Sequence, residues 1–169
     1  MRKLIILRAI LNLFFFFLIM NAIGTLFLFI LFLFSDELLI PIMIDNQQLT
    51  SINQGEIFLM ISAFIGFAFF IYGVFLFKKV LNHFTRRKIF NNEIIRYFKL
   101  IGVSFIIYSF LTNLSIFIYK IAVSNKFEMV FFSGFNSFLF STSIGLFFIV
   151  LAEIFSIAKN YKEESDLTI

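Results

Sequence analysis

Long apolar runs separated by short polar segments dominate the pattern of this chain. Four runs reach the roughly 20 residues that a helix needs to cross a bilayer, and they cover residues 9–34, 57–77, 100–119 and 130–157. None shows the alternation of apolar and polar residues that marks the strands of a membrane barrel. The pattern therefore predicts an all-α polytopic membrane protein, in which residues 1–169 form a single domain with four transmembrane helices.

The composition strengthens this interpretation and excludes several other classes of protein. Hydrophobic residues make up 61% of the chain and charged residues only 14%, which is more apolar surface than a small soluble domain could bury. The absence of Cys excludes a disulfide-linked secreted domain and a zinc site built from thiolates. The single histidine, His83, lies among Lys and Arg residues, where we expect a solvated side chain. We expect no enzyme activity, no metal and no cofactor.

The distribution of basic residues predicts the orientation in the membrane. Three of the 14 Lys and Arg residues precede the first run, seven lie between the second and third runs, and two follow the fourth run. The first loop, residues 35–56, carries acidic residues alone, and only Lys120 and Lys126 lie in the third loop. The positive-inside rule then places both termini and the middle loop in the cytoplasm.

The middle loop itself predicts a helical hairpin that extends the second and third helices into the cytoplasm. Val80, Leu81 and Phe84 continue the helical spacing of the second run. Asn91 is suited to cap the N-terminus of a new helix, with Glu93 in its first turn.

The basic residues of this hairpin have more than one use. Arg86 and Arg87 fit anionic lipid headgroups, and they also fit an acidic protein partner. Direct binding of nucleic acid is not expected, because the charges lie at the membrane and no recognition fold fits between two spans.

The first loop contains an apolar patch, residues 38–44, that includes the only proline, Pro41. We expect this patch to lie along the outer interface of the membrane. The alternative is that the first helix extends as far as Asp45.

Glu153 is the candidate intramembrane acid, because it is the one ionisable residue within the fourth run. It lies near the inner surface by its distance from the start of the run, and we expect either a structural ion pair with Arg8, Lys78 or Lys79 or an acid at the membrane interface. The alternative is a substrate or proton site, since acids within a membrane are costly and are often functional.

Small residues predict where the helices pack. Ser133, Ser137, Ser141 and Gly145 recur every four residues and form a packing seam on the fourth helix. Asn21 and Asn113 lie near the middle of the membrane, where we expect hydrogen bonds between helices. The alternatives are a polar pocket between the helices and a contact between copies in a homo-oligomer.

The C-terminal residues 151–169, LAEIFSIAKNYKEESDLTI, resemble the closing signature of the bacterial membrane family known as domain of unknown function 2975. The residues that match are Leu151, Ala152, Glu153, Phe155, Glu163, Glu164, Asp166, Leu167, Thr168 and Ile169, and those that depart are Ser156, Ala158, Tyr161 and Ser165. The segment Ile89–Glu93 ahead of Leu100-Ile101-Gly102 is similar to a second part of the family pattern.

The resemblance implies a multi-pass protein of the bacterial cytoplasmic (inner) membrane. Members are often encoded beside small Xre-type helix-turn-helix regulators, so the resemblance implies a non-enzymatic sensor or tether for such a regulator. The candidate partner-binding residues are Arg86, Arg87, Phe90, Asn91, Glu163, Glu164, Asp166, Leu167, Thr168 and Ile169. The tail, residues 161–169, would enter a groove of the partner, or it would fold back on the basic hairpin.

Two other functions remain open at this stage. An immunity or stress protein would protect the membrane from a peptide toxin through the loop at residues 35–56. A small-solute transporter would use the polar seams and Glu153, although transporters usually show deeper charges or broken helices.

Overall fold

The computed structural model of the chain describes residues 2–34, 43–44, 47–48, 54–85, 91–123 and 134–167. These residues form four helices, α1 (Arg2–Phe34), α2 (Gln54–Thr85), α3 (Asn92–Val123) and α4 (Gly134–Leu167). Each helix is long and apolar enough to cross a membrane. The all-α prediction is confirmed, and the protein is a multi-pass membrane protein.

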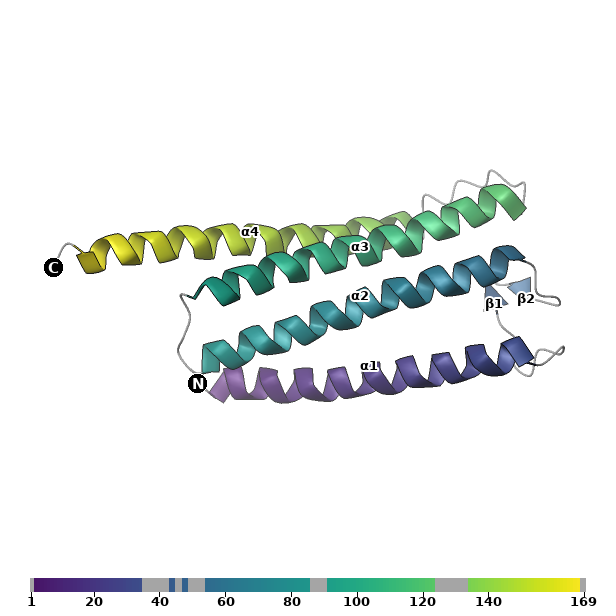
Figure 1. The fold of residues 1–169 in the computed structure, drawn as a ribbon, viewed down its shortest axis with the longest axis horizontal. Helices are drawn as coiled ribbons and strands as arrows, with labels where there is room; N and C mark the ends of the chain where they lie inside the picture. The colour runs from purple at the N-terminus through teal and green to yellow at the C-terminus, as the bar shows by residue number, and fades with distance from the viewer. Residues whose placement is uncertain are drawn as a thin grey trace.

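The helices lie side by side in the order of the chain and alternate in direction (Figure 1). Among the described residues, the backbones of three pairs of helices lie close together, and these pairs are α1 with α2, α2 with α3, and α3 with α4. The two termini lie at the same end of the bundle (Figure 1). We call this end the terminal end.

The helices are longer than the apolar runs that predicted them. Helix α2 continues to Thr85, α3 begins at Asn92, and α4 continues to Leu167. At 1.5 Å per residue each helix is about 50 Å long, whereas the hydrocarbon layer is about 30 Å thick. Much of the length beyond the apolar runs lies at the terminal end, where α2 ends and α3 begins.

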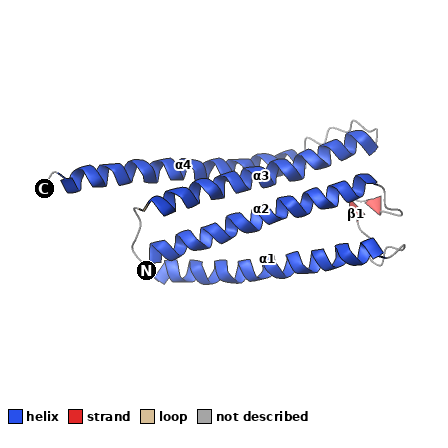
Figure 2. Cartoon of the chain, in the orientation of Figure 1, coloured by secondary structure: helices blue, strands red, loops and turns tan. Residues whose placement is uncertain are grey.

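A short antiparallel pair of strands lies at the opposite end of the bundle (Figure 2). Strand β1 (Met43–Ile44) pairs with β2 (Gln47–Gln48), and Met43 faces Gln48 in the register. The alternative that the first helix extends to Asp45 is therefore wrong, because Met43 and Ile44 already form a strand. The predicted interfacial patch at residues 38–44 lies mostly outside the described residues.

The hydrophobic core joins α2, α3 and α4 near the terminal end. Its buried members are Leu76, Val80, Ile94, Phe98, Ile101 and Ala152. Phenylalanine rings extend this core from α2 to α4: the ring centroids of Phe84 and Phe155 are 5.9 Å apart, and those of Phe98 and Phe155 are 5.2 Å apart. Helix α1 is outside this core, since the apolar window of its span has no buried residue.

Candidate functional site

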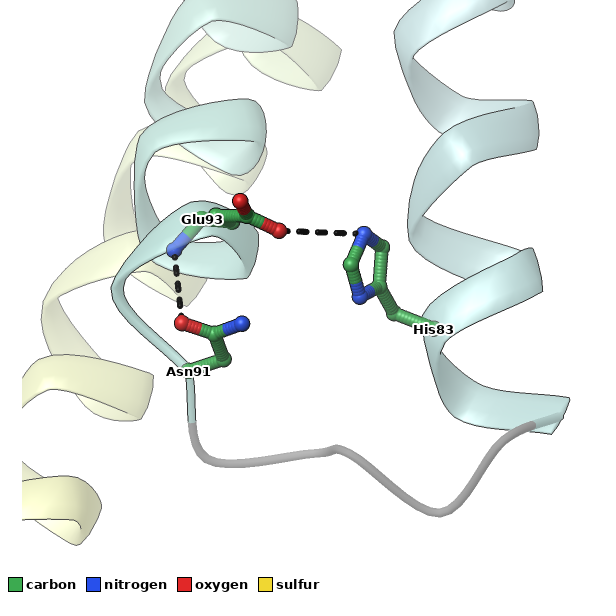
Figure 3. Close-up of polar contacts among 3 residues, drawn as sticks. All are labelled: His83, Asn91 and Glu93. Carbon is green, nitrogen blue, oxygen red and sulfur yellow. Dashed lines mark hydrogen bonds and ion pairs between the residues drawn. The ribbon is translucent and has the colours of Figure 1, made fainter.

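The start of α3 carries a cap and makes a polar contact with the end of α2 (Figure 3). The Asn91 side-chain oxygen accepts a hydrogen bond from the backbone N–H of Glu93 at 3.3 Å, which satisfies one of the free N–H groups at the start of α3. The cap predicted at Asn91 is confirmed. The side chain of Glu93 then points towards α2, where its Oε2 lies 3.4 Å from Nε2 of His83.

The His83 side chain is less exposed than the solvated side chain that the sequence predicted. It is only 23% exposed, because it lies between α2 and α3 beside the ring of Tyr97. Its second ring nitrogen, Nδ1, is buried and has no hydrogen-bond partner among the described residues. Sequence reasoning missed the contact with Glu93. The available signal was the symmetry of the hairpin, since both residues stand five positions from its midpoint at residue 88.

Two lysines follow the last apolar turn of α2 and lie over aromatic rings. The Lys78 Nζ is 4.2 Å from the centroid of the Phe15 ring on α1. The Lys79 Nζ is 4.7 Å from the ring of Phe75 and 5.7 Å from the ring of Tyr97 on α3. Contacts between an ammonium group and the face of a ring are attractive, most of all where water is partly excluded. The two lysines therefore tie α2 to both of its neighbours.

The C-terminal segment is the continuation of α4. Residues 161–167 are all exposed, and α4 extends past the ends of α2 and α3 (Figure 1). Glu163 is paired with Lys159 of the same helix at 3.0 Å. The alternative in which the tail folds back on the hairpin is not supported, because α4 runs as one helix to Leu167.

Glu153 lies on an exposed face of α4. The expected ion pair with Arg8, Lys78 or Lys79 is not formed among the described residues. The ion pair with Arg8 was wrong because α1, which carries Arg8, has no backbone contact with α4. The ion pair with a lysine was wrong because Lys78 lies over the ring of Phe15 and Lys79 over the rings of Phe75 and Tyr97.

Helices α3 and α4 approach each other most closely at two glycines. A Cβ added to Gly102 would lie 2.5 Å from the carbonyl oxygen of Gly145, and one added to Gly145 would lie 2.8 Å from the carbonyl oxygen of Gly102. One turn or two further along, the hydroxyl of Ser109 lies 3.1 Å from the carbonyl oxygen of Phe138 and 3.2 Å from the hydroxyl of Thr142. This contact is a polar connection between described residues of the two helices.

The residues of the predicted packing seam on α4 differ in their positions relative to α3. Gly145 lies at the close approach of the two helices, and Ser141 is half-buried. Ser137 belongs to α4 but its side chain is not among those described, and Ser133 lies outside the described residues. The hydrogen bond expected between helices at Asn113 is wrong, because its amide donates to the carbonyl of Ser109 within α3.

Asn21 does not join two helices either. It lies on the exposed surface of α1, and none of the described hydrogen bonds involves its side chain.

The candidate partner-binding residues are only partly placed by the structure. Asn91, Glu163, Glu164, Asp166 and Leu167 lie at the terminal end, on the hairpin and on the projecting part of α4. The others lie outside the described residues, namely Arg86, Arg87, Phe90, Thr168 and Ile169. Within the described part of the chain, no three His, Cys, Asp or Glu side chains are grouped as metal ligands would be.

Comparison with known proteins identifies the family but no characterised relative. Residues 38–169 match the family model described as "Protein of unknown function (DUF2975)". No curated protein and no solved structure matches the chain. The match covers α2, α3 and α4 together with the strand pair, and it begins after the end of α1. The chain therefore belongs to the DUF2975 family.

Proposed function

We propose that this protein is a non-enzymatic tether in the bacterial inner membrane, which holds a small helix-turn-helix regulator at the cytoplasmic face. Both termini and the α2–α3 hairpin face the cytoplasm in this proposal, as the basic residues at that end favour. The observation that carries it is the projecting end of α4.

The projecting end of α4 offers a binding surface. The last buried core residue of α4 is Ala152, and Phe155 packs against that core. Residues 161–167 are exposed and belong to the part of α4 that extends past the ends of α2 and α3 (Figure 1). Tyr161 and Leu167 are 69% and 86% exposed. A helix that presents apolar side chains among acidic ones is a common ligand for a groove on another protein.

The neighbouring hairpin supports a fixed position for that partner. The cap at Asn91 and the contact between Glu93 and His83 hold the start of α3 against the end of α2. The core residues Val80, Ile94 and Phe98 are buried in the same region. A bound protein would therefore rest against a packed surface.

A photo-crosslinking probe at Tyr161 tests the proposal. The same probe at Phe140 is the control, because the two side chains are equally exposed, at 69% and 68%, but Phe140 lies within the apolar part of α4. We expect the Tyr161 probe in native membranes to form an adduct with one small helix-turn-helix protein, and the Phe140 probe to form adducts with lipid alone. Adducts with lipid alone at both positions would contradict the proposal.

Removal of residues 166–169 gives a second test of the same surface. We expect the shortened chain to reach the membrane at the normal level but to lose the captured regulator. A regulator that still copurifies in full would show that the end of α4 is not its binding surface.

A further inference from the structure

The contact between α1 and α2 follows one seam of α1. Its half-buried residues are Leu4, Leu11, Phe15, Leu18, Ile19, Ala22, Thr25 and Phe29. From Leu11 onward all of them except Ile19 recur at alternating spacings of three and four, the repeat of a left-handed helix pair. Arg8 occupies the position of this repeat between Leu4 and Leu11 and is exposed, so an accessible basic residue lies in line with the residues that face α2.

Lys78 brings a second positive charge to the same seam. Its Nζ lies over the ring of Phe15, and the lysine is half-buried. Arg8 precedes Phe15 by seven residues, which is about 10 Å along the helix. Because α1 and α2 are antiparallel, the α2 residues beyond Lys78 run alongside α1 towards Arg8. Both long side chains can therefore reach one group placed between them.

Neither Arg8 nor Lys78 takes part in the ion pairs described here, which join Glu93 to His83 and Glu163 to Lys159. Glu153, Glu164 and Asp166 belong to α4, whose described residues have no backbone contact with α1 or α2. An aromatic ring attracts an ammonium group but accepts no ordinary hydrogen bond from it. A half-buried Lys retains three donors that favour an anion.

We infer that Arg8 and Lys78 bind the headgroup phosphate of an anionic phospholipid at the contact between α1 and α2. Lys78 directly follows the apolar part of α2, so its ammonium lies at the depth where phospholipid headgroups begin. The neighbouring apolar side chains of α1, such as Ile5 and Leu7, are exposed and can contact the acyl chains. The inference is independent of the regulator proposed above.

Native mass spectrometry of the full chain in detergent tests this site. We expect one molecule of dioleoylphosphatidylglycerol to remain bound under conditions that remove dioleoylphosphatidylcholine. The double variant Arg8→Gln/Lys78→Gln should bind phosphatidylglycerol roughly 30-fold more weakly, a factor that corresponds to about 2 kcal/mol. The variant Arg8→Lys/Lys78→Arg keeps both charges and should retain the lipid.

The control removes the same charge elsewhere at the terminal end. Arg96 and Lys99 are exposed on α3, and Arg96→Gln/Lys99→Gln should leave the bound lipid unchanged. An equal loss in the two double variants would overturn the site, because general attraction would then explain the binding. Displacement of the lipid by inorganic phosphate would also overturn it, since the site would then take a free anion.

Discussion

Replacement of Gly102 by Ala tests the close approach of α3 and α4. The added Cβ would lie 2.5 Å from the carbonyl oxygen of Gly145 and 2.6 Å from Cγ1 of Ile149. Neither distance is compatible with van der Waals contact, and the carbonyl oxygen belongs to the backbone of a helix and cannot rotate away. The two helices must therefore move apart along a contact that includes the hydrogen bonds of Ser109.

The expected size of the effect follows from two opposing contributions. Overpacking of a tight contact costs about 1–3 kcal/mol, and separation of the helices adds the weakening of the Ser109 contact. Replacement of Gly by Ala within a helix gains about 1 kcal/mol. We expect Gly102→Ala to lower the free energy of unfolding by about 2 kcal/mol, measured by circular dichroism in mixed micelles with increasing dodecyl sulfate.

Two other glycines provide matched controls for this experiment. A Cβ added to Gly24 on α1 would meet nothing within 4 Å, so Gly24→Ala should be neutral or stabilising. A Cβ added to Gly66 would meet the methyl group of Thr112 at 3.1 Å, which is a contact that a side chain can relieve, so the cost there should be smaller. If Gly102→Ala is as stable as Gly24→Ala, the described approach of α3 and α4 is incorrect.

Three further predictions concern the core, the polar contact and the orientation. Phe98→Ala should lower the free energy of unfolding by about 3 kcal/mol in the same assay, because Phe98 is buried in the core. Phe117→Ala, on an exposed face of α3, should lower it little, and equal losses would contradict the position of the core. Ser109→Ala should cost about 0.6 kcal/mol, as is usual for a hydrogen bond between membrane helices, and no change would mean that the contact is absent. Since the chain has no Cys, single cysteines at Gln48 and Tyr161 should react with an impermeant maleimide from opposite sides of the membrane, and labelling from one side would refute the orientation.

Features set by local sequence could be predicted without the structure. The lengths of the apolar runs determine the number of helices, and the side chain of Asn91 next to Glu93 determines where α3 begins. The continuation of α2 past the charged pair Lys78-Lys79 could be predicted because Val80 and Leu81 keep the helical spacing of apolar residues. Each of these signals lies within a few residues of the feature that it predicts.

Features that depend on the neighbours of a helix could not be predicted in the same way. The position of Glu153 within the fourth apolar run was readable from the sequence, but its partner depended on whether α1 or α3 lies beside α4. The seam of small residues on α4 was visible in the sequence, yet the pairing of Gly145 with Gly102 depends on how α3 and α4 are rotated about their axes. The contact of His83 required the register of the hairpin, which the basic residues around it concealed.

The isolation of α1 from the core has a consequence for the topology of the chain. Helices α2 to α4 share one core and lie within the family match, whereas α1 contributes no buried residue to its span. Three crossings place the start of α2 and the end of α4 on opposite sides of the membrane, and a fourth crossing returns the N-terminus to the side of the C-terminus. Helix α1 thus makes the number of crossings even without adding a buried residue to the core of α2, α3 and α4, and it brings the basic N-terminal residues to the end of the bundle from which α4 projects.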